Sequence, residues 1–99
     1  MDFAGFDWDA GNRAKCAKHG VSIETIEGLF TRPLAILPDA VHSVVERRFK
    51  AFGKAPDGRS VFVVFTIRRG NLIRPISART MHAREIRTYE KENPDLQKR

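Results

Sequence analysis

The stretch that decides the fold is Ser60–Glu90, SVFVVFTIRRGNLIRPISARTMHAREIRTYE. Its first part, 61–66, is the most apolar run of the chain, rich in Val and Phe and too short for a buried helix. A run of this kind, bounded by turn residues, predicts a buried strand. Residues 69–71 include Gly and Asn, which tolerate positive φ angles and predict a tight turn. Residues 72–78 then form the return strand.

The return strand leads into a C-terminal helix. Thr80 offers a hydroxyl N-cap, and 81–91 is rich in residues that favour helices. Pro75, inside the return strand, lacks an N–H and therefore removes one ladder hydrogen bond. We expect this strand to lie at the edge of the sheet, with a bulge at Pro75 as the alternative.

The N-terminal half predicts two further helices. Asp9 is a natural N-cap for a helix over 10–19, with Gly20 just past its end, and Ser22 is a natural N-cap for a helix over 23–30. The expected strands around this pair of helices are 2–8, 34–37 and 46–54, and a turn over 55–58 follows the last of them.

The resulting element order is β-α-α-β-β-β-β-α. Strands joined by hairpins, with helices near both ends of the chain, predict an α+β fold. We expect a small antiparallel sheet of about four strands, with the helices packed on one face. A chain of 99 residues is sufficient for one modest core, so 1–91 is expected to form a single domain and 92–99 a polar tail.

The composition argues against several classes of protein. No apolar run is long enough to span a membrane and no signal-peptide pattern is present, so we expect a cytoplasmic protein. The single cysteine, Cys16, agrees with a reducing compartment. There is no Cys/His cluster at zinc spacing, no P-loop and no dinucleotide fingerprint, and neither a metal nor a cofactor is expected.

The charge is unevenly distributed. Residues 1–42 hold 4 Lys and Arg against 6 Asp and Glu, a net charge of −2, whereas residues 43–99 hold 14 against 6, a net charge of +8. The excess positive charge, mostly Arg, therefore lies on the predicted sheet and last helix. Its natural partners are polyanions, either nucleic acid or an acidic protein; the alternative is a generic solvated surface.

Arginine is the first candidate functional group. Guanidinium groups bind phosphate in a bidentate manner and stabilise the extra charge of a phosphoryl transition state. Alternatively, these side chains are solvated or pair with Glu46 or Glu85, and this alternative is favoured for the two beside the turn. The set comprises Arg48, Arg68, Arg69, Arg74, Arg79 and Arg84.

Histidine and the last helix provide further candidates. His19 ends the first predicted helix, where it either caps the last carbonyls or transfers protons, and His42 lies in a loop where it can act as a general acid or base. His82 is expected to pack. Glu85 either orients Arg79 or Arg48 or forms surface pairs, and Tyr89 either stacks on a base or fills the core.

Several segments together resemble the BrnT family of toxins. They are Trp8-Asp9, Lys18-His19-Gly20-Val21-Ser22, Leu29-Phe30, Glu46 and Arg48 ahead of Gly53, and Ile76-Ser77-Ala78-Arg79 with Glu85 and Tyr89. The resemblance spans roughly 6–90. It implies a fold similar to that of RelE-type ribonucleases and the role of toxin in a bacterial type II toxin–antitoxin pair. It also implies a small BrnA-like antitoxin with a DNA-binding domain, which neutralises the toxin and with it represses their operon.

With this resemblance, a metal-independent endoribonuclease is the expected activity, and the arginines fit the charge that it must stabilise. Arg79 and Arg48 are the expected stabilisers of the phosphorane, with His19 or His42 as proton-transfer group and Glu85 as orienter. The side chains expected to contact RNA are Lys18, Arg74, Arg84 and Tyr89.

Two departures from the family pattern bear on activity. The family often has Lys at the position of Asn12 and Asn at that of Cys16, so we expect either weaker activity here or RNA binding that depends on Lys15 and Lys18. Pro75 stands where an aliphatic residue is usual. Two other readings also fit the sequence: a non-catalytic basic module that binds RNA or DNA, and an interaction protein whose basic face binds an acidic antitoxin segment.

Overall fold

The computed structural model describes residues 3–32, 34–39 and 46–92. The elements follow the predicted order. They are β1 (Gly5–Phe6), α1 (Ala10–Ala17), α2 (Ile23–Leu29), β2 (Ala35–Pro38), β3 (Phe49–Lys54), β4 (Ser60–Arg68), β5 (Leu72–Thr80) and α3 (Ala83–Glu92). The expected tail lies outside the described residues except for Glu92, which belongs to α3.

The strands form one mixed sheet of five, in the order β1-β5-β4-β3-β2. The neighbours from β2 to β5 pair antiparallel, but β1 runs parallel to β5, with Gly5 opposite Leu72 and Phe6 opposite Ile73. The predictions of about four strands and of a purely antiparallel sheet are therefore wrong. The first strand was hard to place from sequence because its partner lies more than sixty residues further along the chain.

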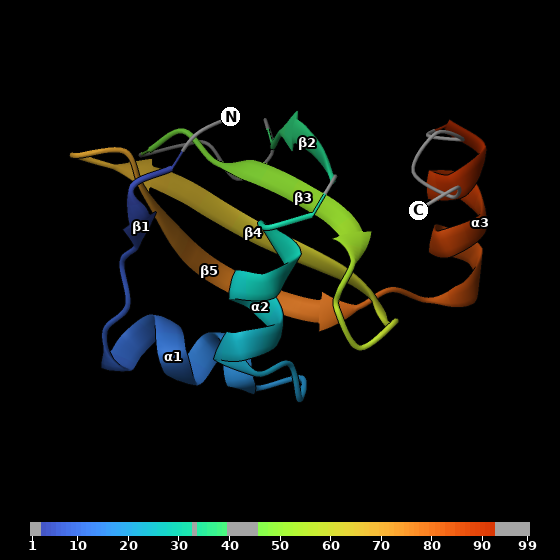
Figure 1. The fold of residues 1–99 in the computed structure, drawn as a ribbon, viewed down its shortest axis with the longest axis horizontal. Coiled ribbons are helices and arrows are strands. Elements are labelled where there is room, and N and C mark those ends of the chain that lie inside the picture. Colours follow the sequence, from blue (N-terminus) through green and yellow to red (C-terminus); the bar gives the residue numbers. More distant parts are fainter. Residues whose placement is uncertain (1–2, 33, 40–45, 93–99) are drawn as a thin grey trace.

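Helices α1 and α2 cover one face of the sheet and enclose the core (Figure 1). The side chains that point from β3 and β4 into this layer include Ala51, Val63 and Phe65, each fully buried. The ring of Phe65 packs edge-to-face on Phe30 and stacks on Phe49, at centroid distances of 5.2 and 5.5 Å.

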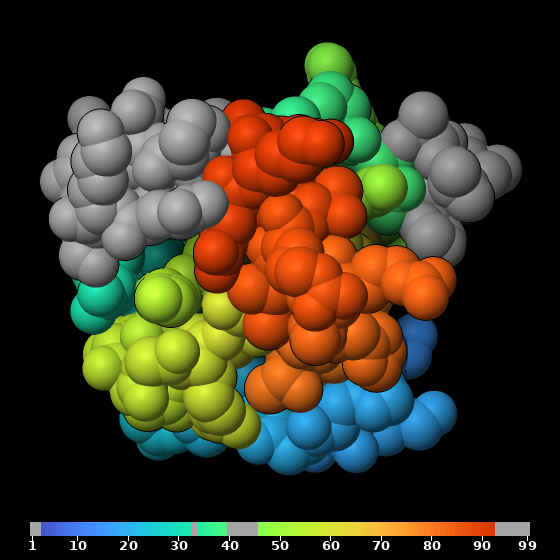
Figure 2. Space-filling model, turned by 90° about the vertical axis from the view of Figure 1, so that its right-hand side faces the viewer, coloured from blue at the N-terminus to red at the C-terminus, as the bar shows by residue number. Residues whose placement is uncertain are grey.

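The opposite face, here named the outer face, carries the alternate residues of the same strands. Phe52, Phe62 and Arg79 are direct cross-strand neighbours on it. Helix α3 lies against this face, because the Tyr89 ring stacks on Phe52 at 5.7 Å and its hydroxyl donates to the Phe52 carbonyl at 3.0 Å. The expectation that all helices share one face is therefore wrong for α3 (Figures 1 and 2).

Pro75 does not lie on an edge strand, since β5 is flanked by β4 and β1. The alternative, a bulge, is what the structure has: the β4–β5 register shifts at Val64/Phe65. The Pro75 carbonyl points away from β4 and accepts a hydrogen bond from the Asn12 side chain at 2.8 Å. In a strand, the N and the carbonyl of one residue point to the same side. The N of Pro75 therefore faces the side on which β1 lies, but beyond the end of that short strand, so its missing N–H costs no ladder hydrogen bond.

Most of the predicted helix caps and turns are confirmed. Asp9 and Ser22 cap α1 and α2, and the turn after β4 has Gly70 and Asn71 at φ angles of 82° and 61°. Thr80 is not the cap of α3, because β5 continues through it and the helix begins at Ala83. None of the described helices is both long and apolar enough to cross a membrane.

Candidate functional site

The most developed polar site lies where β5 meets α3. The Arg79 guanidinium donates to both carboxylate oxygens of Glu85, Nη1 to Oε1 at 2.7 Å and Nη2 to Oε2 at 2.8 Å. The same Oε1 accepts the backbone N–H of His82 at 2.9 Å, which is the reciprocal half of a helix cap. Glu85 therefore anchors the first turn of α3 and orients Arg79, as one of the two sequence alternatives proposed.

One edge of this guanidinium remains available. Nη1 uses its second N–H on the Thr80 carbonyl at 3.3 Å, whereas none of the described residues accepts a hydrogen bond from Nε. The N–H of Nε and the second N–H of Nη2 lie on one edge of the planar group, which is the geometry that binds two phosphate oxygens. The side chain is 34% exposed, so this edge can be reached from solvent.

The ring of Phe62 packs against the guanidinium of Arg79. The Cζ atom of Arg79 lies 4.8 Å from the centre of the Phe62 ring, within the range of a cation–π interaction. Sequence reasoning missed Phe62 because its run was read only as core. The signal was present, since strand alternation places Phe62 on the face opposite Val61 and Val63.

The ionisation of the pair is set by its hydrogen bonds. The bonds from Arg79, and next the N–H of His82, lower the pKa of Glu85 to about 2. The carboxylate in turn raises the pKa of Arg79 above its usual value. Near neutral pH both groups are fully charged, so Glu85 can position Arg79 but has no proton to donate.

A groove of about 520 Å³ lies beside this site, between α3 and the strands β2 and β3. Its walls are mostly apolar and include Leu37, Phe52 and Tyr89, and Arg84 and Glu85 lie along it. Leu37 is 51% exposed. Tyr89, expected either to stack on a base or to fill the core, instead joins α3 to the sheet and lines this groove.

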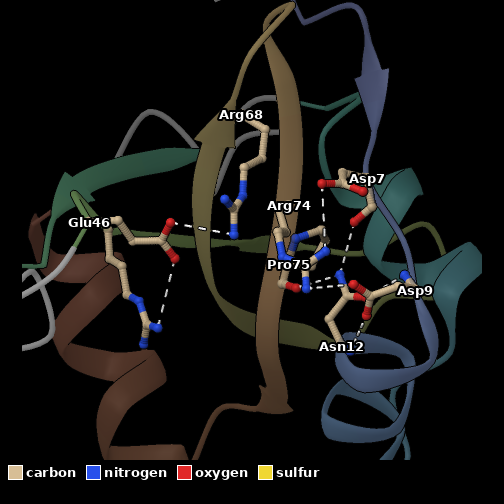
Figure 3. A network of polar contacts seen from close by, with 8 residues as sticks. Asp7, Asp9, Asn12, Glu46, Arg68, Arg74 and Pro75 are labelled. Carbon is tan, nitrogen blue, oxygen red and sulfur yellow. Dashed lines mark hydrogen bonds and ion pairs between the residues drawn. The ribbon is translucent and has the colours of Figure 1, made fainter.

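Arg74 belongs to a separate network, which joins β5 to the segment between β1 and α1 (Figure 3). Its guanidinium lies 2.8 Å from Asp9 Oδ2 and 3.6 Å from Asp7 Oδ2, and its side chain is only 17% exposed. The pKa of Asp9 is lowered, first by the backbone N–H of Asn12 and next by Arg74. The structure thus ties Arg74 to the segment between β1 and α1 instead of presenting it to a ligand.

Asn12 completes this network. Its Oδ1 accepts the Asp9 N–H at 2.7 Å, and its Nδ2 donates to the carbonyls of Asp7 and Pro75 at 2.9 and 2.8 Å. The side chain is 3% exposed. At this position, where Lys was expected from the family pattern, Asn therefore joins the start of α1 to β5.

Arg48 and Arg68 both face Glu46, at 3.9 and 3.5 Å. They lie toward the opposite end of the sheet from Arg79, because Arg48 precedes β3 whereas Arg79 is aligned with Phe52 near its end. The arginines of the sequence prediction therefore do not converge on one point: Arg48 and Arg68 share Glu46, whereas Arg74 and Arg79 pair with carboxylates elsewhere.

The remaining predicted residues lie apart from the Arg79–Glu85 pair. Lys18 and His19 are exposed after the end of α1, which packs on the core side of β5, and no hydrogen bond or ion pair joins them to the pair within the described residues. His42 lies outside the described residues. His82, expected to pack, is exposed just before α3, because the helix begins at Ala83, two residues later than predicted.

The described ranges contain neither a reactive cysteine nor a cluster of metal-binding side chains. Burial raises the pKa of the Cys16 thiol to about 11, so it is no nucleophile near neutral pH. No group of three or more His, Cys, Asp or Glu side chains is placed to hold a metal ion within 3–32, 34–39 and 46–92.

Comparison with known proteins assigns the chain to a family. The chain matches no curated protein. The model of one protein family, described as the ribonuclease toxin BrnT of type II toxin–antitoxin systems, matches residues 8–85. The matched range runs from the tryptophan before α1 to Glu85 and so contains both partners of the Arg79–Glu85 pair. The chain therefore belongs to the BrnT family of ribonuclease toxins of type II toxin–antitoxin systems.

Proposed function

We propose that this protein is a metal-independent endoribonuclease that acts in the cytoplasm, arrests growth by cleaving RNA and is neutralised by a BrnA-like antitoxin. Membership of the family supports the ribonuclease activity. The observation that carries the assignment of the site is the free edge of Arg79, held between Phe62 and Glu85.

The reaction that fits is internal attack on the RNA backbone. A base removes the proton of a 2′-hydroxyl, whose oxygen forms a bond to the adjacent phosphorus. The phosphorane that results carries extra negative charge, and an acid protonates the 5′-oxygen as its bond to phosphorus breaks. The products are a 2′,3′-cyclic phosphate and a 5′-hydroxyl. Preorganised cations lower the barrier by stabilising the phosphorane.

Arg79 is the group proposed to bind the phosphorane. Its Nε and Nη2 hydrogens contact two non-bridging oxygens, and the carboxylate of Glu85 keeps the guanidinium in place without giving up a proton. Arg48 lies too far along the sheet to share the same oxygens in this conformation, and we assign it to a neighbouring phosphate. His19 and His42 are the candidates for proton transfer.

Of the four side chains expected to contact the rest of the RNA, we keep two in that role and assign the other two to the fold. Arg84 lies beside Glu85 on an exposed turn of α3, and Lys18 is exposed after α1, so both can bind phosphates. Arg74 is engaged by two carboxylates and Tyr89 by Phe52, so we assign them to holding the fold. An antitoxin that covers the outer face would block access to Arg79.

The test is to incubate the purified protein, free of antitoxin, with total RNA in EDTA. We expect cleavage with 2′,3′-cyclic phosphate ends, and growth arrest on expression. Arg79→Ala should lower kcat by about 10²- to 10³-fold, as removal of a charge-stabilising donor does. Arg79→Lys should restore little, because an ammonium cannot bond Glu85 and phosphate together in the same geometry. Arg87→Ala, an exposed arginine on the same helix, is the matched control.

The result also separates the competing readings. RNA left intact in EDTA, but bound in a salt-dependent manner, would support the non-catalytic binding module. RNA neither cut nor bound, together with tight binding of an acidic antitoxin segment, would support the interaction protein. Cleavage at the wild-type rate by Arg79→Ala would remove the site assignment while leaving the ribonuclease activity in place.

A further inference from the structure

A second basic concavity lies at the other end of the sheet. We name it the hairpin hollow; it has a volume of about 440 Å³ and adjoins the turn between β4 and β5. Three arginines, two apolar side chains, one hydroxyl and one carboxylate line it, namely Arg47, Arg68, Arg69, Phe49, Ile67, Thr66 and Glu46. For the two arginines beside the turn, Arg68 and Arg69, sequence reasoning favoured solvation or a pair with Glu46 or Glu85, and Arg68 does pair with Glu46.

Contacts within the fold fix the backbone on both sides of the hollow. Thr66 donates its hydroxyl to the Arg47 carbonyl at 2.7 Å, which fixes the chain ahead of β3 against β4. Arg47 then lies over the Phe49 ring at 5.7 Å. On the other side, the positive φ angles of Gly70 and Asn71 set the turn that carries Arg69. The arginines are therefore displayed from fixed backbone positions.

The charges of the hollow are only partly balanced. Glu46 faces Arg68 at 3.5 Å and Arg48 at 3.9 Å, so one carboxylate serves two guanidinium groups. Within the described ranges neither Arg47 nor Arg69 forms an ion pair, and both are exposed. A net positive charge therefore remains at this end of the molecule.

Cations and apolar surface occur together here, and this combination suits single-stranded nucleic acid. Ile67 is 36% exposed beside the arginines, although most large apolar side chains of the described chain are covered. Guanidinium planes stack on unpaired bases and also bind phosphates, and aromatic or apolar surfaces accept the faces of bases. Carboxylates of an acidic protein segment would pair with the arginines, but they would not cover the exposed side chain of Ile67.

The hollow lies far from Arg79. Phe62, which is opposite Arg79, and Arg68 are six positions apart on β4, about 20 Å at the usual rise of a strand. We propose that the hairpin hollow binds single-stranded RNA several nucleotides away from the cleaved linkage, with Arg47 and Arg69 on phosphates and a base against Ile67. This inference rests on the proposed function, whose substrate it extends to a single strand that runs from Arg79 on the outer face around the end of the sheet to Arg47 and Ile67, which alternate with the core side.

The experiment measures binding apart from cleavage. Fully 2′-O-methylated oligonucleotides lack the attacking hydroxyl and cannot be cut by this route, so their affinity is measured by fluorescence anisotropy at lengths from about four to about sixteen nucleotides. The test variant is Arg47→Ala with Arg69→Ala. The matched control is Arg13→Ala with Arg59→Ala, which removes two exposed arginines from α1 and from the β3–β4 hairpin. Circular dichroism checks that both variants are folded.

For the long oligonucleotides we expect the hollow variant to bind at least about tenfold more weakly than the control. The slope of log K against log salt should also fall by about 1 to 2, since two phosphate contacts are lost. The gain in affinity from the shortest to the longest oligonucleotide should be smaller for the hollow variant than for the control, because only a long strand can contact both ends at once. Replacing the same two arginines by Lys should restore the salt slope more than the affinity, because an ammonium keeps the charge but does not stack.

Equal affinity of the hollow variant and the control for the long oligonucleotides would overturn the inference. So would a hollow variant that keeps its RNA affinity but loses affinity for an acidic antitoxin, because the surface would then serve a protein. A failure of the proposed function looks different: wild-type protein would leave unmodified RNA intact, whatever the hollow binds.

Discussion

Helices α1 and α3 are attached to the same strand, β5, in two different ways. Helix α1 packs along β5 on the core side, buries Asn12 and Cys16, and is bonded to the Pro75 carbonyl. Helix α3 follows the end of β5 and buries none of its residues. The contacts described above for α3 are the Arg79–Glu85 pair and the Tyr89–Phe52 pair.

This difference separates the scaffold from the site. Segments with few buried contacts open at low cost, whereas core segments open only with global unfolding. The free edge of Arg79 depends on the lightly held helix, because Glu85 belongs to α3. The α1–α2 layer, by contrast, fixes β5, the strand on which Arg79 lies. The predictions below test whether the two helices are as unequal as these contacts indicate.

The largest effect is expected in the core. Leu29→Ala removes a fully buried side chain of α2, beneath Gly53, and should lower the free energy of unfolding by about 2–5 kcal/mol. Ile86→Ala, on the half-buried side of α3, should cost only about 1 kcal/mol. Urea unfolding followed by circular dichroism measures both. Equal losses would mean that α3 is part of the main core after all.

The next effect concerns the clamp between α1 and β5. Asn12→Ala leaves the Pro75 and Asp7 carbonyls without their donor and removes half of the capping box, which should cost about 1–3 kcal/mol. Arg13→Ala, on the exposed side of the same helix, should be nearly neutral. The comparison uses midpoints of urea unfolding at constant m-value. A neutral Asn12→Ala would show that the clamp is dispensable.

A smaller and local effect is expected at Tyr89. Tyr89→Phe keeps the stack on Phe52 but loses the hydrogen bond to the Phe52 carbonyl, worth about 1 kcal/mol. Because α3 can open without the rest, the change should speed amide hydrogen exchange in α3 while exchange in β4 stays the same. Thr88→Ala, whose hydroxyl bonds only within the helix, is the control. Faster exchange throughout the sheet would contradict the separation of the two regions.

The smallest effect is the pH dependence of α3. The pKa of Glu85 is lowered from 4.5 to about 2 in the folded protein, so its contribution is complete above pH 4.5 and is lost as the pH falls toward 2. Protection of α3 amides should therefore decrease between these limits. Glu85→Gln should remove this step and leave α3 less protected at neutral pH. Unchanged titration in the Gln variant would assign the step to another carboxyl.

The sequence was most informative where the determinants are local. The caps at Asp9 and Ser22, the turn at Gly70 and Asn71, and the order of the elements depend on neighbouring residues, and all were predicted. The Arg79–Glu85 pair was also among the alternatives, because the two residues lie six positions apart across one short link.

Non-local partners explain the errors. Nothing near Gly5 indicates that it pairs in parallel with Leu72, and nothing near Arg74 indicates that Asp7 and Asp9 occupy its guanidinium. The side of the sheet on which α3 packs was missed for a similar reason. It depends on Phe52, whose contact with Tyr89 joins residues that are far apart in the sequence.

The parallel pairing of β1 with β5 has a consequence for synthesis on the ribosome. The partners of the N-terminal strand and of Asn12, Leu72 to Pro75, emerge more than sixty residues after them. Contacts of such large sequence separation form late and slow folding. Arg79 and Glu85 leave the exit tunnel later still, so a growing chain has neither a closed sheet nor an oriented guanidinium. Fragments from synthesis that stops before Glu85 would lack the proposed site.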